Sequence, residues 1–324
     1  MKIKKLFPRI IFLCILLFPI FLYAQRDSTY TSLESALSNP DQVYSLSIAY
    51  KNIETLPEEI GLLKNLEHLY AFSNKISKLP ESFKELKNLK TLNLFGNQFK
   101  DFPEEICSLP NLTSLNMGFN NLTKIPATIN GLKKLSVLSC VGNLLEDKHL
   151  FLPPNLDSLN LMSNNLTQVP EAVWGCKKLK VLVLGGNKIN SISPKLSNLE
   201  ELVLLYLNQM PLTKLPASIG KLKKLEVLSL SNNAFPYQRI RNFPKSMTNL
   251  KNIKNLDLSE LRLKKFPQWI CSLTALEVLD LRGNEITTLP DCLKKLKHLK
   301  EIKSGDNEIP TEVIDAFFKL KNEK

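Results

Sequence analysis

Few residues in the sequence could hold a metal ion or perform catalysis. The three histidines, His68, His149 and His298, are scattered along the chain, whereas a zinc site needs several histidine or cysteine ligands brought together. The sequence contains no glycine-rich phosphate loop, no G-x-S-x-G nucleophile elbow and no H-E-x-x-H zinc motif. These absences predict a protein without catalytic residues, metal or cofactor.

Binding through exposed aromatic rings is indicated instead by residues at alternate positions of short segments. His68, Tyr70 and Phe72 alternate with leucine and alanine, and Phe95 stands 23 residues after Phe72. Alternate residues of a β-strand face the same side, so such a segment has one core face and one free face. Free faces that carry Tyr and Phe are typical of protein-binding surfaces.

A repeat positions these segments along nearly the whole chain. Its clearest marker is a column of asparagines, spaced at intervals of 23 residues except for one interval of 21 and one of 28. The column runs through Lys51, Asn74, Asn97, Asn120, Asn143, Asn164, Asn187, Met210, Asn233, Leu261, Asn284 and Asn307. A unit this short cannot bury its own leucines, so the repeats must stack on one another.

The pattern within each repeat resembles that of the leucine-rich-repeat family. The motif L-x-x-L-x-L-x-x-N-x-L is present as Leu89, Leu92, Leu94, Asn97 and Phe99. An added L-P-x-x-I element, at 56–60 and 215–219, is similar to the 23-residue subclass found in many bacterial proteins and in Ras-associated plant and animal ones. The resemblance implies an α/β fold of about twelve repeats: a right-handed solenoid with a curved parallel β-sheet on its concave face and short helices or 3-10 turns on its convex face.

The physical roles of the repeated residues lead to a similar architecture. Leu92 and Leu94 are two apart and point to the core, and parallel strands about 4.8 Å apart give a sheet roughly 55 Å long. The asparagine amide is expected to bond backbone groups of the turn that the sheet leaves unpaired. Prolines such as Pro80 are expected at the first helical position of the return segment, where their missing N–H is harmless.

The N-terminal segment, residues 1–24, is predicted to be a signal peptide. Four basic residues precede an apolar run from Ile10 to Leu22, and Ala24 offers a small residue for cleavage before Gln25. A membrane anchor is the alternative, but a spanning helix needs about 20 apolar residues. The mature protein is therefore expected to be exported, to a secreted, periplasmic or cell-surface location.

The repeats, at 43–310, are expected to lie between two caps in a single domain. An N-terminal cap helix is predicted within 25–42, where Thr31 and Glu34 have the spacing of a capping box. A C-terminal cap helix is predicted over 311–324, where apolar residues recur at helical spacing.

Some repeats depart from the pattern. Lys51, Met210 and Leu261 replace the asparagine and should interrupt its hydrogen bonds. Drift of the repeat near a cap or an insertion is the simpler explanation for these substitutions than a functional role. The 28-residue repeat inserts a loop that either contacts a partner or is a tolerated surface insertion. Its residues suited to such contact are Tyr237, Arg239 and Arg241.

Five cysteines remain after removal of the leader, and an exported protein rarely keeps free thiols. Cys107 and Cys271 are seven repeats apart and cannot pair within one chain. Cys140 and Cys176 occupy leucine positions and are expected in the core. Cys271 and Cys292, in adjacent repeats, are the one conceivable pair, but the strict geometry of a disulfide argues against it.

The outward strand positions are predicted to bind a protein partner, because the fold leaves them free of packing. β-Propensity alone is the competing explanation for aromatic residues there. His68 is expected to be one more contact rather than a ligand or base, because its column holds no acidic or cysteine partner. The candidate partner-binding residues are Tyr50, His68, Tyr70, Phe72, Phe95, Phe119, Met162 and Tyr206.

The basic charge supports a second hypothesis. The chain carries 43 Lys and Arg against 31 Asp and Glu, a net charge of +12 that becomes +8 without the four basic residues of the leader. Lysine pairs such as 133–134 and 294–295 are expected on the convex face, as solvated residues or as a weak site for a polyanion or an anionic surface, in an envelope-associated or adhesion protein. Nucleic acid is not expected, because aromatics and lysines lie on opposite faces. No small-molecule substrate is predicted.

Overall fold

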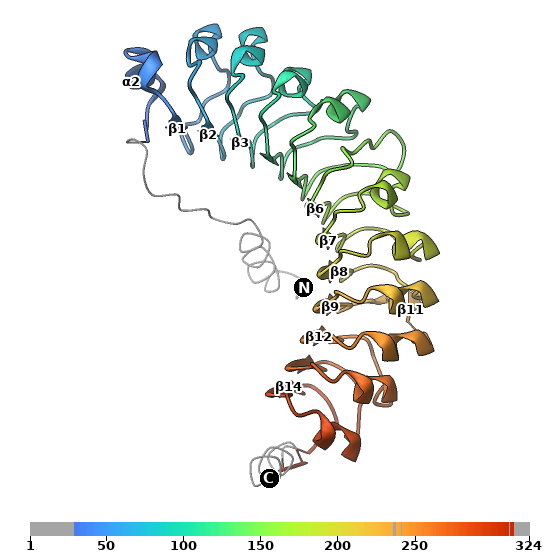
Figure 1. Ribbon diagram of the computed structural model, residues 1–324. Coiled ribbons are helices and arrows are strands. Elements are labelled where there is room, and N and C mark those ends of the chain that lie inside the picture. The colour runs from blue at the N-terminus through green and yellow to red at the C-terminus, as the bar shows by residue number, and fades with distance from the viewer. Residues whose placement is uncertain (1–28, 236–237, 241, 311, 314–324) are drawn as a thin grey trace.

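The computed structural model describes residues 29–235, 238–240, 242–310 and 312–313. They form an arc in which the strands line the inner, concave edge and short helical turns line the outer, convex edge (Figure 1). Twelve parallel strands form one sheet in chain order, as the repeat predicts. The predicted signal peptide and nearly all of the predicted C-terminal cap helix fall outside the described residues.

The strands of the sheet are three residues long and recur once per repeat. They are β1 (Ser45–Ser47), β2 (His68–Tyr70), β3 (Thr91–Asn93), β4 (Ser114–Asn116), β5 (Val137–Ser139), β6 (Ser158–Asn160), β7 (Val181–Val183), β8 (Leu204–Tyr206), β9 (Val227–Ser229), β12 (Asn255–Asp257), β13 (Val278–Asp280) and β14 (Glu301–Lys303). Central leucines pair in register, for example Leu92 of β3 with Leu115 of β4, and both are fully buried. The core is therefore a continuous stack of leucines behind the sheet.

The return segments on the convex side are 3-10 helices of five residues. They are η3 (Glu58–Leu62), η4 (Glu81–Glu85), η5 (Glu104–Ser108), η6 (Ala127–Gly131), η7 (Glu171–Gly175), η8 (Pro194–Asn198), η9 (Ala217–Lys221), η10 (Lys245–Asn249), η11 (Gln268–Ser272) and η12 (Asp291–Lys295). The prolines were predicted at the first helical position of these segments, and this prediction is wrong by one residue. Pro80 precedes η4 as its N-cap in extended conformation, because its fixed φ of −71° suits the entry to the turn.

The asparagine column forms the hydrogen-bond ladder that the sequence predicts. Asn97 Oδ1 accepts from the Ile76 amide at 2.9 Å, while Nδ2 donates to the carbonyls of Ala71 and Leu94 at 3.0 Å each. Ala71 O also accepts from Asn74 Nδ2, so this carbonyl has two asparagine partners. The ladder thus links each repeat to its neighbour, and it is redundant in the sense that a backbone carbonyl accepts from two asparagines.

That redundancy explains how the ladder tolerates its three substitutions. The predicted interruption at Met210 does remove one side-chain amide, and Met210 is fully buried instead. However, the Met210 amide donates to Asn233 Oδ1 at 2.6 Å, and Leu207 O still accepts from Asn233 Nδ2 at 2.7 Å. Lys51 and Leu261 likewise donate their backbone amides to the asparagine of the following repeat.

An N-terminal cap lies within the range 25–42. It consists of helix α2 (Leu33–Leu37) and the 3-10 helix η2 (Pro40–Gln42). The predicted capping box is wrong, because the N-cap is Ser32, whose side chain accepts from the Ser35 amide rather than pairing Thr31 with Glu34. Tyr30 forms a parallel bridge to Leu46, which covers the open edge of β1.

The two irregular repeats differ from the others on the outer side of the arc. The 28-residue repeat contains an antiparallel pair, β10 (Ala234–Phe235) and β11 (Gln238–Arg239), followed by the buried Ile240. Of the predicted contact residues there, Tyr237 and Arg241 lie outside the described residues. The 21-residue repeat has no 3-10 helix between the described strands β5 and β6. Phe151, in this shortened return, is 40% exposed.

Close approach between return segments makes one glycine sensitive to substitution. A Cβ atom at Gly220 in η9 would lie 2.3 Å from the carbonyl oxygen of Ser246 in η10. We expect Gly220→Ala to lower the free energy of unfolding by about 1–3 kcal/mol, because the backbone of the next repeat must move. Urea unfolding measures the change. Gly175→Ala in η7 is the control, since a Cβ there meets no atom within 4 Å. Equal losses in both variants would contradict this expectation.

Candidate functional site

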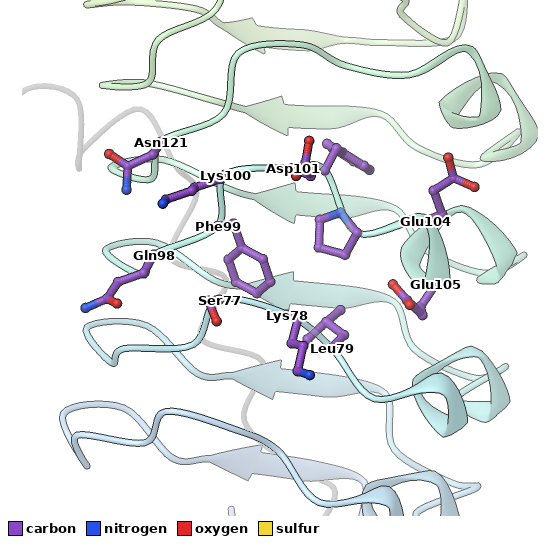
Figure 2. A pocket seen from close by; sticks show the side chains of 12 residues that line it. Ser77, Lys78, Leu79, Gln98, Phe99, Lys100, Asp101, Glu104, Glu105 and Asn121 are labelled. Carbon is purple, nitrogen blue, oxygen red and sulfur yellow. The ribbon is translucent and has the colours of Figure 1, made fainter.

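A hollow lies on the flank of the solenoid, beside the loops that lead from the strands to the 3-10 helices (Figure 2). A second hollow adjoins it, because Asp101, Phe102 and Glu104 line both. The first has a volume of about 690 Å³ and is lined by polar and charged side chains around Phe102 and Pro103. The second, of about 580 Å³, is bordered by His149 and Phe151. The described residues contain no group of three side chains that could hold a metal ion. No sequence motif pointed to these hollows, and their side chains form no catalytic arrangement.

The concave face carries a cluster of aromatic rings over its first repeats. The rings of Tyr50 and Phe72 meet edge to face with centroids 5.2 Å apart. Those of Phe95 and Phe119 lie 5.0 Å apart. Tyr50 is 72% exposed and Phe119 is 41% exposed. We call these four residues the aromatic patch; all four were candidates from the sequence.

Two members of the aromatic patch stand where the backbone is left-handed. The residue before the asparagine column has a positive φ in repeat after repeat, and glycine fills it at Gly96 and Gly142. Tyr50 (φ 58°) and Phe119 (φ 51°) occupy the same place. This conformation costs an L-residue with a side chain roughly 1–2 kcal/mol. Bulky aromatic residues are thus held at strained positions that glycine would occupy without cost.

The ring of Phe119 lies across the neighbouring repeat. A Cβ on Gly142 would lie 3.2 Å from the Phe119 ring, so the ring lies over this glycine. Gly118 has a similar role, because a Cβ there would be 2.7 Å from Val141 and 3.1 Å from Phe95. The small residues let the larger ones close into a continuous apolar surface.

That apolar surface continues into the middle repeats. Val141, Met162 and Val183 form a buried cluster, against which Phe95, Val181 and Tyr206 pack. Met162 is only 4% exposed. The prediction that Met162 contacts a partner directly is therefore wrong, because neighbouring side chains cover it. Met162 instead packs beneath the apolar surface. Tyr206 is half-buried at the edge of this cluster.

His68 and Tyr70 lie on β2 beside the aromatic patch, each half-buried. Burial lowers the pKa of His68, and Lys90 lowers it further, although the nearby carboxylate of Glu67 opposes both. Its Nε2 lies 3.9 Å from Glu67 Oε2, and its Nδ1 has no hydrogen-bond partner. Burial also raises the pKa of Tyr70. Both side chains are neutral at physiological pH and fit a contact surface better than an acid or base.

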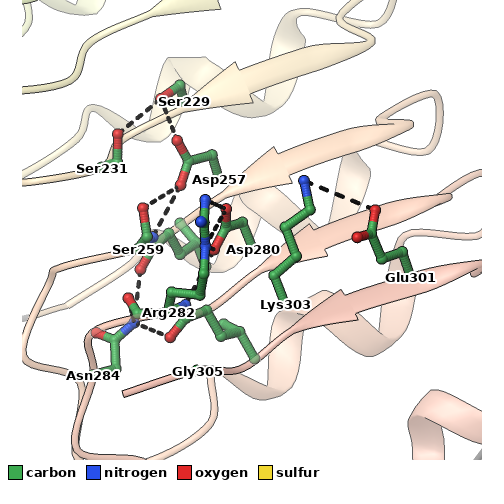
Figure 3. Close-up of polar contacts among 12 residues, drawn as sticks. Ser229, Ser231, Asp257, Ser259, Asp280, Arg282, Asn284, Glu301, Lys303 and Gly305 are labelled. Carbon is green, nitrogen blue, oxygen red and sulfur yellow. Dashed lines mark hydrogen bonds and ion pairs between the residues drawn. The ribbon is translucent and has the colours of Figure 1, made fainter. Parts of the chain in front are cut away.

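The last repeats give the concave face a polar end (Figure 3). Asp257 accepts hydrogen bonds from Ser229 Oγ at 3.0 Å and from Ser259 Oγ at 2.7 Å. Arg282 Nε donates to both carboxylate oxygens of Asp280 at 2.9 and 3.0 Å. This pairing raises the pKa of Arg282. Asp280 is only 7% exposed. The side chains on the concave face therefore change from aromatic in the first repeats to charged in the last repeats.

Family models match several parts of this repeated sheet. The model described as Leucine Rich repeats (2 copies) matches residues 64–109, Leucine rich repeat matches 154–212, and Leucine Rich Repeat matches 111–132 and 275–296. The chain belongs to the leucine-rich-repeat family. Among curated proteins, no sequence matches this leucine-rich-repeat chain significantly.

Solved structures similar to this leucine-rich-repeat chain include bacterial proteins with the same fold. A leucine-rich-repeat protein of Leptospira interrogans is 28% identical, with a TM-score of 0.50 over 91% of this chain and 98% of that protein. An internalin, InlF, of Listeria monocytogenes is 19% identical, with a TM-score of 0.70 over 87% and 80%. The functional domain of InlJ from the same organism is 22% identical, with a TM-score of 0.65 over 83% and 54%.

The cysteines differ from the sequence prediction in one respect. Cys271 and Cys292 form a disulfide between η11 and η12, with their Cα atoms 5.6 Å apart. The argument against this pair is wrong, because adjacent return segments bring the two residues within the usual range for a disulfide. Cys140 and Cys176 are fully buried as predicted, and burial raises their pKa values to about 12 and about 11. Burial of this kind disfavours the thiolate, which is the reactive form of cysteine.

We expect the disulfide to stabilise the last repeats. It closes a loop with a sequence separation of 21 residues. The Cys271→Ser/Cys292→Ser variant should lose about 2–3 kcal/mol of stability in urea unfolding. Reductant should lower the midpoint of the native protein to that of the variant and leave the variant unchanged. A native midpoint that does not respond to reductant would contradict a stabilising role.

Proposed function

We propose that this chain is an exported, non-catalytic scaffold that binds a protein partner through the aromatic patch of its concave face. The observation that carries this proposal is the placement of two large, exposed aromatic side chains, Tyr50 and Phe119, at turn positions that the other repeats fill with glycine or polar residues. The left-handed backbone recurs in every repeat, so what sets these two positions apart is the large apolar side chain that each exposes there. β-Propensity does not explain them, because neither residue lies within a strand. They are also the most exposed members of an apolar surface, which suits a partner interface.

Two features support export. The N-terminal sequence has the pattern of a signal peptide. The Cys271–Cys292 disulfide suits an oxidising compartment, since cytosolic proteins seldom keep such bonds. No helix among the described residues is long and apolar enough to cross a membrane.

The alternative, a polyanion bound by the basic convex face, is weakened by ion pairs. Lys224 lies 2.6 Å from Glu201, and Lys294 lies 2.6 Å from Asp291. Lysines already paired in this way attract a polyanion less strongly. Binding of that kind would also weaken steeply with added salt, whereas aromatic contacts would not.

Affinity capture from cell-surface extracts tests the proposal. Residues 25–324 would be compared with the Tyr70→Ser/Phe95→Ser/Phe119→Ser variant, after circular dichroism shows that both are folded. We expect a partner that the native protein retains at moderate salt and the variant loses. Equal capture by both proteins, or capture that disappears with salt alone, would overturn the proposal and favour the basic convex face.

A further inference from the structure

The concave face ends in an unusual arrangement of like charges. Asp257 of β12 and Asp280 of β13 are directly opposite each other in the parallel register. Carboxylates in such a pair repel each other and weaken the sheet. Glu260 follows β12 at a left-handed position, with a φ of 55°, and is exposed. Three acidic residues therefore lie close together at this end of the concave face.

Among the described residues, Arg282 is the cation bonded to one of these carboxylates. Lys303 of β14 lies opposite Asp280 in the parallel register, and its Nζ is 3.8 Å from Glu301 Oε2. Arg282 is bonded to Asp280, while Asp257 and Glu260 act on Arg282 only through the longer-range field. The hydrogen bonds of Asp257 come from Ser229 and Ser259, which are neutral. Asp257, Glu260, Asp280 and Arg282 leave a net charge of −2 on this part of the face, and the charges of the neighbouring Lys303 and Glu301 cancel each other. A cationic group from outside would offset that charge.

The negative charge here is specific to the concave face. Residues 214–310 hold 18 Lys and Arg against 10 Asp and Glu, so this stretch of chain is strongly basic. Residues 29–213, by contrast, hold 17 of each. An acidic surface inside the most basic part of the molecule is not a consequence of composition. It is a local property of the residues that face the inside of the arc.

The distance between the aromatic patch and the acidic residues determines how long a bound peptide segment must be to reach both. Phe95 follows β3 and Asp257 ends β12, which is seven strands further along the sheet. Seven steps of about 4.8 Å separate them by roughly 34 Å. An extended chain covers that distance in about ten residues, at 3.3–3.6 Å each.

From these observations we infer that the partner presents an extended, dipolar segment to the concave face. This segment has aromatic or large aliphatic side chains at the aromatic patch, and Lys or Arg about ten residues away at the acidic end. The inference rests on the proposed function and adds the chemistry of the ligand. Charge complementarity along the face would also fix the direction in which the segment binds.

Selection from a library of displayed random 16-residue peptides, with residues 25–324 as bait, tests the inference. We expect enriched peptides to combine an apolar block with basic residues about ten positions away, in one order. The Asp257→Asn/Glu260→Gln variant removes two charges and leaves the Asp280–Arg282 pair in place. An enriched peptide should bind this variant about tenfold more weakly. The control is Glu59→Gln/Glu200→Gln, which makes the same change in net charge at exposed residues away from the sheet.

The outcomes separate this inference from the proposed function. Peptides that need Phe95 and Phe119 but bind the Asp257→Asn/Glu260→Gln variant unchanged would overturn the dipolar ligand and leave the aromatic patch as the site. A library that yields no binder, or binders indifferent to Phe95 and Phe119, would overturn both. Equal weakening in the Glu59→Gln/Glu200→Gln control would show that the effect comes from the net charge of the protein rather than from the acidic end of the concave face. That result would also overturn the inference.

Discussion

Asn120→Ala is expected to lower the free energy of unfolding by about 3 kcal/mol. Asn120 is 7% exposed, and its Oδ1 accepts from the Phe99 amide at 3.0 Å. Its Nδ2 donates to the carbonyls of Leu94 and Met117 at 3.0 Å each. A buried amide without an acceptor costs about 1–3 kcal/mol, and each further hydrogen bond contributes roughly 0.5–1.5 kcal/mol. The two carbonyls keep a second asparagine, Asn97 or Asn143, so the orphaned amide dominates the loss.

Equilibrium unfolding in urea measures this loss. The matched control is Asn121→Ala, because Asn121 is the next residue along the chain and is exposed. It should change stability by less than about 0.5 kcal/mol, as surface substitutions usually do. A similar stability loss in both variants would show that the ladder contributes less than its geometry suggests.

Phe95→Ala is expected to weaken binding of the captured partner by about 10- to 100-fold. The Phe95 ring contacts Phe119 and packs against the buried cluster of Val141, Met162 and Val183. Aromatic residues at the centre of an interface contribute about 2 kcal/mol or more when truncated. Most of the change should lie in the dissociation rate.

Surface-based binding kinetics would give both rates for this variant. Phe151→Ala is the control, because Phe151 is an equally large side chain, 40% exposed, on the flank of the solenoid. It should leave both rates unchanged. If Phe151→Ala weakened binding and Phe95→Ala did not, the partner would occupy the flank hollows instead.

The solenoid can be predicted well from the sequence because the leucines and asparagines that define it recur with a regular period. A strand of three residues cannot be recognised by itself, but Leu92, Asn97 and their equivalents recur at fixed spacing in repeat after repeat. The redundancy of the asparagine ladder could not be predicted, since it depends on which carbonyls two neighbouring amides reach. The same limit applies to Ser32, which replaces Thr31 as the N-cap.

The candidate site could be predicted in outline only. The alternating pattern identified the outward column, but burial of Met162 depends on side chains from neighbouring repeats. The disulfide depends on how the return segments face each other. A signal for the strained positions was present: Tyr50 and Phe119 stand in a column that holds Gly96 and Gly142 elsewhere. The register pair of Asp257 and Asp280 was likewise visible once the repeats were aligned.

Site-specific photo-crosslinking of the captured partner tests most directly whether the concave face is the recognition surface. A photoreactive amino acid would replace Tyr70 on β2 in one protein and Leu62 in η3 on the convex side in another. Leu62 is 53% exposed and Tyr70 is half-buried, so part of each side chain is accessible to a partner. We predict a crosslinked partner from position 70 and none from position 62. Crosslinking from position 62 alone would contradict recognition by the concave face.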